Sequence, residues 1–173
     1  HVRFRGEAVA ALVGTADVLA AIDDAEFPVM WTPLSPLIGT DAALADGAPA
    51  LHTHIPDNVL TRGNLKCGDV ARGHASASVT AEGDFETGFV EHAYIEPEAG
   101  YANGTGEHVQ IVACTQAPYM DREDVARVLG IPEADVRITP TACGGGFGGK
   151  LDVSVQPILA VAFAKVRKPV RLV

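Results

Sequence analysis

The chain has 173 residues, of which 47% are hydrophobic and 20% are charged. These values are typical of globular proteins, so they argue against a disordered or fibrous chain, and the length suits one domain or two small ones. The formal net charge of −9 argues against a nucleic-acid binder, because a phosphate backbone requires a basic face. No apolar run approaches the roughly 18 residues that span a bilayer, and the first residues lack the apolar core of a signal peptide.

The cysteines and histidines do not form a recognisable metal-binding pattern. Cys67, Cys114 and Cys143 are an odd number without Cys-x-x-Cys spacing, which predicts reduced thiols and a cytoplasmic protein. His52 and His54 lack a third ligand nearby in the sequence, so we interpret them as loop residues. The chain begins within an expected strand and ends in an apolar extended run, and we therefore expect it to be a piece of a larger polypeptide.

The first half of the chain predicts a strand–helix–strand unit followed by loops. Apolar residues over 2–13 predict one or two buried strands. Thr15 is the expected N-cap of a helix over 16–22, and a short strand is expected over 29–31. Turn-forming residues dominate 35–69, so this stretch is expected to be loops.

The second half predicts alternating strands and helices. Asp121 is the expected N-cap of a helix that Gly130 ends, and apolar residues at helical spacing predict a second helix from Val155 to Val166, stopped by Pro169. Strands are expected over 75–87, 108–115, 136–141 and 170–173.

Residues 144–150 contain five glycines between an expected strand and an expected helix. Glycine permits positive φ angles and close approach to the backbone, and a simple turn would need only one or two. The run could be a flexible connector. It also satisfies the dinucleotide fingerprint, as Gly144-x-Gly146-x-x-Gly149, and most of a phosphate-binding loop ending at Lys150. Leu151 stands where such a phosphate loop needs Ser or Thr for magnesium, which argues against that alternative.

Several segments together resemble the molybdenum-binding large subunit of the xanthine dehydrogenase and aldehyde oxidase family, the molybdenum hydroxylases. Their order and rough spacing match the family along the whole chain. The resemblance implies an α+β fold, in which residues 1–55 are the later part of an α/β hammerhead domain with a linker and residues 56–173 are the N-terminal portion of the molybdopterin-binding domain. The segments are Gly6–Ala10, Glu91–Glu98, Thr115–Gln116, Leu129–Pro132, Gly144–Lys150 and Lys168–Arg171.

The resemblance also implies a molybdenum–molybdopterin cofactor, whose metal is held by the dithiolene of the pterin and needs no protein ligand. Cofactor contact is carried over onto Gly145, Gly146 and Phe147, because oriented backbone amides can meet anionic or oxo groups. Phe147 would pack against a flat substrate ring. The alternative is a phenylalanine buried in the core beneath the loop.

Two positions depart from the family pattern and shape the expected substrate pocket, which comprises Phe147, Leu151 and Val90. Val90 stands where many members have a glutamine that faces the metal's oxo group. Leu151 stands where purine-oxidising members have a glutamate, and Asp152 is a poor substitute because one helical position rotates a side chain by roughly 100°. An aldehyde or a less polar N-heterocycle is therefore expected rather than xanthine.

Two further side-chain groups near the loop have structural interpretations. We interpret Glu91 and His92 as a buried, charge-assisted pair behind the pocket rather than as general bases, because buried polar groups need partners. Cys143 is interpreted as a packed small residue rather than a nucleophile, because the sequence identifies no group that would lower its pKa.

The sequence therefore predicts a fragment of a molybdenum hydroxylase that inserts water-derived oxygen into a C–H bond of an aldehyde or N-heterocycle. The family's catalytic base is expected beyond Val173, so no catalytic residue is assigned here and the fragment alone should be inactive. Iron–sulfur and FAD groups are expected on other domains or subunits, which makes those subunits and the rest of the large subunit the expected partners. The alternatives are a nucleotide-binding module that uses residues 144–150, and a non-catalytic structural remnant.

Overall fold

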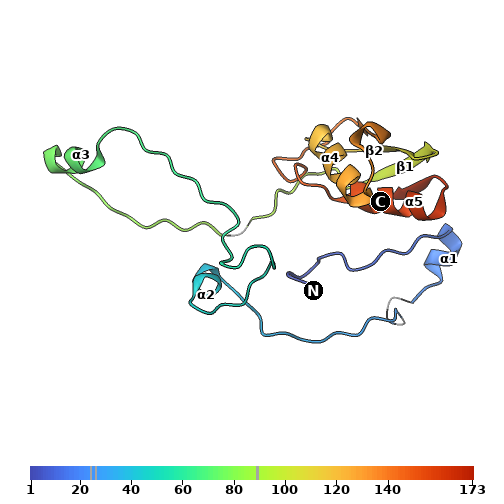
Figure 1. Cartoon of the computed structure of the whole chain (residues 1–173), viewed down its shortest axis with the longest axis horizontal. Helices are drawn as coiled ribbons and strands as arrows, with labels where there is room; N and C mark the ends of the chain where they lie inside the picture. The colour runs from blue at the N-terminus through green and yellow to red at the C-terminus, as the bar shows by residue number, and fades with distance from the viewer. Residues whose placement is uncertain (24, 26, 89) are drawn as a thin grey trace. The chain divides into compact units, whose positions relative to one another are not determined.

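A computed structural model describes residues 1–23, 25, 27–88 and 90–173 (Figure 1). The chain forms two compact units. One contains His1–Val9 and Asp23–Thr87, and the other contains Ala10–Ile22 and Gly88–Val173. Each unit is described by itself below, and the predicted boundary at residues 55 and 56 stays a prediction.

The first unit has little regular structure. It contains the short helices α2 (Thr40–Leu44) and α3 (Val70–Ser76). Asn58 organises one turn, where its side chain accepts a hydrogen bond from the Leu51 amide at 2.8 Å and donates to the carbonyls of Ala43 and Pro49. The loops predicted for 35–69 are confirmed apart from α2.

The strands predicted over 2–13, 29–31 and 75–87 are wrong. The described residues of 2–13, 29–31 and 77–87 have no strand structure, and residues 75 and 76 belong to α3. A strand is stable only when a neighbour pairs with its N–H and C=O groups, and within the described ranges these segments have no such neighbour. Helix α3 was missed because Asp69, which accepts a hydrogen bond from the Arg72 amide as an N-cap, had been assigned to a turn.

The second unit contains a four-stranded mixed sheet. Its strands are β1 (Gly100–Thr105), β2 (His108–Ala113), β3 (Val136–Pro140) and β4 (Val170–Leu172), in the spatial order β3-β2-β1-β4. β1 pairs antiparallel with β2 and with β4, whereas β2 and β3 are parallel. The predicted strands at β2, β3 and β4 are confirmed.

The sequence did not predict β1, because glycine and asparagine are poor strand formers. The structure explains one of these glycines by close packing. A Cβ on Gly100 would lie 2.8 Å from the Val112 carbonyl oxygen and 3.0 Å from Leu159 on a neighbouring helix. A larger residue would therefore push the helix away from the sheet.

The described residues of this unit also form three helices and one 3-10 turn. Helix α1 (Ala16–Ala20) has Thr15 at its N-cap as predicted, although the Thr15 side chain makes no capping hydrogen bond. Helix α4 (Pro118–Leu129) is followed by the 3-10 turn η2 (Glu133–Asp135), and helix α5 (Val155–Val166) precedes β4.

The two long helices end as predicted, but one begins elsewhere. Gly130 ends α4 in a left-handed conformation with φ of 68°. Its predicted N-cap, Asp121, is wrong, because the N-cap is Ala117 and Asp121 is buried inside the first turn. Pro118 at the start of the helix needs no N–H partner, which favours this earlier start. Helix α5 has the predicted bounds, and Arg167 ends it.

Helices α4 and α5 pack against each other and against the sheet. The unit is thus a mixed α and β structure with a small sheet, and its core lies between the helices and the strands (Figure 1). In the described ranges, no helix is both long enough and apolar enough to cross a membrane. The core residues are Ala102, Val109, Ile111, Ala113, Val125, Ala126, Val136, Val155, Leu159, Ala160 and Phe163.

Candidate functional site

The glycine loop, Gly144–Lys150, connects β3 to α5 at one end of the sheet. β2 and β3 are parallel, so Gln116 and the loop both follow the carboxyl ends of their strands. β1 runs antiparallel to β2, and Gly100 at its start pairs with Ala113 at the end of β2. The segment 92–98, which precedes β1, therefore reaches the same end of the sheet. This end is where open sheets of parallel strands commonly bind ligands.

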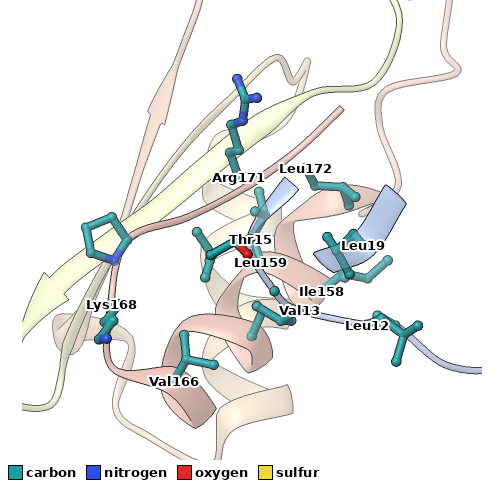
Figure 2. Close-up of a pocket in the computed structure, with 15 residues that line it drawn as sticks. Leu12, Val13, Thr15, Leu19, Ile158, Leu159, Val166, Lys168, Arg171 and Leu172 are labelled. Atoms are coloured by element: carbon teal, nitrogen blue, oxygen red, sulfur yellow. The ribbon is translucent and has the colours of Figure 1, made fainter. Parts of the chain in front are cut away.

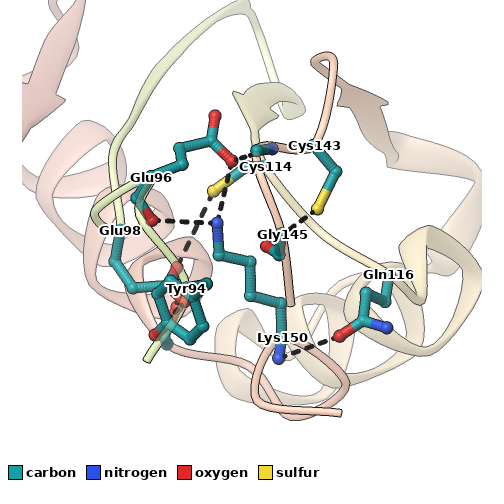
Figure 3. A network of polar contacts seen from close by, with 10 residues as sticks. Tyr94, Glu96, Glu98, Cys114, Gln116, Cys143, Gly145 and Lys150 are labelled. Atoms are coloured by element: carbon teal, nitrogen blue, oxygen red, sulfur yellow. Dashed lines mark hydrogen bonds and ion pairs between the residues drawn. The ribbon is translucent and has the colours of Figure 1, made fainter. Parts of the chain in front are cut away.

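An ion pair between the buried Lys150 and the partly exposed Glu96 joins the glycine loop to the segment before β1 (Figure 3). The Lys150 Nζ donates to the Glu96 carboxylate at 2.8 Å and to the Glu96 carbonyl at 3.1 Å, and it lies 4.4 Å from the centre of the Tyr94 ring. Only 1% of the Lys150 side chain is exposed.

Both members of this pair are held in their charged forms. Burial alone would lower the pKa of Lys150, but the interactions with Glu96 and Cys114 outweigh it and leave this pKa above its usual value. The hydrogen bond from Lys150, followed by that from the Gly144 amide, lowers the pKa of Glu96. The pair is therefore an ammonium and a carboxylate at neutral pH.

The two ends of the glycine loop are fixed by side-chain acceptors. The Gly144 amide donates to the Glu96 carboxylate at 2.7 Å. The Gln116 side-chain oxygen accepts from the amides of Gly148 at 3.1 Å and Lys150 at 3.3 Å. The backbone amide of Gln116 in turn donates to the Lys150 carbonyl at 3.0 Å. A flexible connector would not need these contacts, which argues against that alternative.

Three consecutive amides in the middle of the loop have no hydrogen-bond acceptor within the described ranges, namely those of Gly145, Gly146 and Phe147. The amides that follow in the loop do have acceptors. Those of Gly148 and Lys150 donate to Gln116, and that of Gly149 donates to the Gly146 carbonyl at 2.7 Å. Gly145 and Phe147 have positive φ angles of 105° and 51°. Successive amides in such alternating conformations can bind an anion. These are the three residues for which cofactor contact was predicted.

The glycines themselves are required by packing within the chain. A Cβ on Gly144 would lie 2.5 Å from the Cβ of Glu96, and a Cβ on Gly149 would lie 2.9 Å from the Tyr94 ring and 3.0 Å from the His92 ring. The loop therefore fits tightly against the segment 92–98.

Comparisons with known proteins agree with this arrangement. A family model described as the molybdopterin cofactor-binding domain matches residues 51–173. The chain belongs to this family.

Relatives of this domain include oxidoreductase subunits. The nicotinate dehydrogenase large molybdopterin subunit of Eubacterium barkeri is 34% identical and matches 99% of this chain, which covers 40% of that protein. The xanthine dehydrogenase molybdenum-binding subunit of Escherichia coli O157:H7 is 32% identical, with 96% of this chain and 22% of that protein covered. The chain thus spans less than half the length of these relatives.

A solved structure is also similar. The aldehyde oxidoreductase from Desulfovibrio gigas has a TM-score of 0.66 and 29% identity, covering 76% of this chain and 15% of that one. The resemblance predicted from the sequence is therefore confirmed.

The three residues predicted to line a substrate pocket are all at the surface of the domain. Phe147 is 75% exposed, Leu151 44% and Val90 81%. Phe147 is therefore not part of the hydrophobic core formed by the described residues. Whether the three residues line a pocket in the whole protein stays a prediction.

Two structural interpretations near the glycine loop are wrong. Glu91 and His92 are both exposed, and the Glu91 carboxylate lies 3.9 Å from the His92 Nδ1, so they are not a buried pair. Cys143 is also exposed rather than packed, and its Sγ donates to the Gly145 carbonyl at 3.2 Å. Glu91, His92 and Cys143 are thus at the surface, and no side chain of the described residues covers them.

Sequence reasoning did not assign roles to the residues that support the loop. Glu96 and Lys150 are 54 positions apart, and Gln116 and Gly148 are 32 positions apart, so no local motif connects them. Glu98 extends the same polar cluster, since it accepts hydrogen bonds from the hydroxyls of Tyr94 at 3.0 Å and Ser154 at 2.7 Å.

The nucleotide-binding alternative receives no support from the geometry. In a phosphate-binding loop the lysine ammonium reaches the phosphates and a helix follows directly. Here the Lys150 ammonium is bound to Glu96, and α5 begins only at Val155.

Two other candidate features do not include the predicted site residues. A cavity of about 500 Å³ lies next to α5 and β4 (Figure 2). It is lined by residues 11–15, by Leu19 and by several residues between 158 and 172. None of the predicted site residues lines it. The rings of His52 and His54 are 5.6 Å apart, and the described part of the chain contains no group of three His, Cys, Asp or Glu residues placed to hold a metal ion.

Proposed function

We propose that this chain is part of the large subunit of a molybdenum hydroxylase and that Gly145, Gly146 and Phe147 contact its molybdopterin cofactor. The observation that carries this proposal is the set of three consecutive amides without an acceptor, on a loop fixed at both ends, in a member of the molybdopterin cofactor-binding domain family. Residues 1–55 would belong to the preceding α/β hammerhead domain, and residues 56–173 to the N-terminal portion of the cofactor-binding domain.

The residues present fit such a group. Molybdopterin carries anionic and oxo groups, and free backbone amides are suitable donors for them. When bound, the cofactor supplies a redox-active metal that allows water-derived oxygen to be inserted into a substrate C–H bond. The part of this chain is to orient the cofactor with the three amides and to offer the exposed ring of Phe147 to a flat substrate.

The proposed substrate is an aldehyde or a weakly polar N-heterocycle. Leu151 and Val90 are apolar and exposed near the ends of the two segments that meet at the site, so they offer no hydrogen bond to a polar purine. The similar structure from Desulfovibrio gigas is an aldehyde oxidoreductase, which agrees with this class, whereas the similarity to a xanthine dehydrogenase subunit does not distinguish it from a purine.

The remaining components of the enzyme would come from outside these residues. The catalytic base is proposed to lie in a later part of the parent protein, and iron–sulfur and flavin groups on other domains or subunits. The three cysteines form no disulfide with one another in the described ranges, which is compatible with a cytoplasmic enzyme.

The cofactor proposal is tested on the intact parent protein, purified from cells that synthesise molybdopterin. We expect molybdenum and pterin in equal amounts, and no specific binding of ATP or NAD. A fully folded parent protein that contains neither molybdenum nor pterin would refute the proposal and favour a structural remnant.

The substrate proposal is tested by replacing Leu151 with glutamate in the same protein. A carboxylate at this place can accept hydrogen bonds from a purine, so the ratio of kcat/KM values should shift toward purines by about tenfold. Val128→Glu is the matched control, because Val128 is also exposed but lies on α4. An unchanged substrate profile in Leu151→Glu would show that Leu151 does not line the pocket.

A further inference from the structure

We propose that Gln116 and the Glu96–Lys150 ion pair are positioning residues that hold the amides of residues 145–147 in the conformation that receives the cofactor. This inference rests on the proposed function and adds residues that do not themselves touch the cofactor.

The ion pair closes the glycine loop at its two ends. One oxygen of the Glu96 carboxylate accepts from the amide of Gly144, the first residue of the loop, at 2.7 Å. The same oxygen accepts from the ammonium of Lys150, the last residue, at 2.8 Å. A single carboxylate oxygen therefore fixes the separation of the loop ends.

Lys150 is not available to bind a ligand directly. An ammonium group has three N–H donors. Two of its contacts are the Glu96 carboxylate and the Glu96 carbonyl, and the ammonium also lies over the Tyr94 ring. The side chain is almost fully buried. Its effect on the cofactor must therefore act through the loop.

Gln116 binds the last part of the loop, residues 148–150. Its side-chain oxygen accepts from the backbone amides of Gly148 and Lys150. Its own backbone amide donates to the Lys150 carbonyl. Gln116 itself is exposed and contributes nothing to the hydrophobic core. Its two side-chain contacts with the loop can therefore be removed by substitution without changing the hydrophobic core.

Together the two supports satisfy the loop amides on either side of residues 145–147 and leave those three amides free. A loop that is already ordered before binding does not lose conformational entropy when the ligand arrives. Loosening either support should therefore weaken cofactor retention while the rest of the fold remains intact.

The decisive variants are Gln116→Met and Gln116→Glu in the intact parent protein. Methionine has a similar length but does not provide the amide oxygen, whereas glutamate keeps an oxygen that accepts from both amides. Gln110→Met, the same substitution on β2, is the matched control. A second pair, Glu96→Gln and Lys150→Met, tests the ion pair in those variants that fold.

Three quantities are measured: hydrogen exchange of the 144–150 amides in cofactor-free protein, the rate at which molybdenum is lost from loaded protein, and the thermal midpoint. In Gln116→Met we expect loop exchange and molybdenum loss to be faster by about tenfold, the effect of a lost hydrogen bond, with only a small fall in the midpoint. Gln116→Glu should restore both rates, and Gln110→Met should match the parent.

The outcomes separate this inference from the proposed function. Suppose the parent protein carries the cofactor, but in Gln116→Met the loop amides exchange and molybdenum is lost at the parent's rates. Gln116 is then not a positioning residue. If the rates rise equally in Gln116→Glu, the acceptor oxygen is not the cause and the inference is also overturned. A parent protein that never carries the cofactor refutes the proposed function itself, and the positioning role falls with it.

Discussion

Asp121 lies on α4 as a fully buried carboxylate, and replacing it with asparagine should stabilise the domain. One of its oxygens accepts from the Gln156 side chain at 3.3 Å, and the other, Oδ1, has no hydrogen-bond partner within the described ranges. Burial is the main cause that raises the pKa of Asp121, and the nearby Asp124 carboxylate adds to it. A buried acceptor without a partner costs about 1–3 kcal/mol.

The sign of the pH dependence follows from the raised pKa. Between the ordinary aspartate pKa of roughly 3.9 and the raised value, the folded domain holds a proton that the unfolded chain has lost. The free energy of unfolding therefore falls as the pH rises through this interval and stays low above it. Asparagine cannot ionise, so Asp121→Asn should remove this part of the fall.

We expect Asp121→Asn to raise the free energy of unfolding near pH 7 by about 1 kcal/mol, because the neutral amide keeps the contact with Gln156 and removes the cost of burying a charge. Urea denaturation of the intact protein between about pH 4 and pH 8 measures both the gain and the slope. Asp124→Asn is the control, because Asp124 is about one-third exposed and paired with Arg127, so its loss should change stability by less than about 0.5 kcal/mol. A loss of stability in Asp121→Asn, or an unchanged slope with pH, would refute the reasoning.

The remaining predictions concern packing in the core and beneath the loop. Leu159 on α5 is 1% exposed, so Leu159→Ala should lower the free energy of unfolding by about 2–5 kcal/mol, whereas Val161→Ala, at a half-exposed position of the same helix, should cost less than about 1 kcal/mol. Equal losses in urea denaturation would contradict this. Gly144→Ala places a Cβ 2.5 Å from the Cβ of Glu96 and should destabilise by about 1–3 kcal/mol, while Gly63→Ala meets open space and should be neutral. A neutral Gly144→Ala in thermal unfolding would show that the loop relaxes freely.

The sequence predicted the part of the fold whose elements carry their own local signals. Helix α5 combines apolar residues at helical spacing with a proline after its end, and β2 and β3 are rich in β-branched residues. Helix α4 was found, but its start was misplaced, because aspartate favours an N-cap and Asp121 instead occupies a buried helical position. Strand β1 was missed, since its glycines serve packing that only the folded structure reveals.

The strands predicted over 2–13, 29–31 and 75–87 failed for a different physical reason. A pattern of apolar and β-branched residues describes the preference of a single segment, whereas a strand also needs a hydrogen-bonded neighbour. Met30 and Phe85 are almost fully exposed in the segments concerned. The strand preference of these segments therefore led to a wrong prediction, because no neighbouring strand pairs with them in the described ranges.

The candidate site was located from the sequence, but its support was not. The density of glycines marked residues 144–150, and the resemblance to a known family pointed to Gly145, Gly146 and Phe147. Glu96 and Gln116 carry no local signal of their roles, because their partners are distant in the sequence. Only the meeting of three segments at one end of the sheet identifies them.

The sequence separation of Glu96 and Lys150 has a consequence for the order of assembly. The 54 positions between them span the β1–β2 hairpin, α4 and β3, so their ion pair can form only after all of these elements have docked. A nascent or partly folded chain consequently lacks the closed loop. Cofactor insertion during maturation would then be restricted to chains in which the second unit has finished folding.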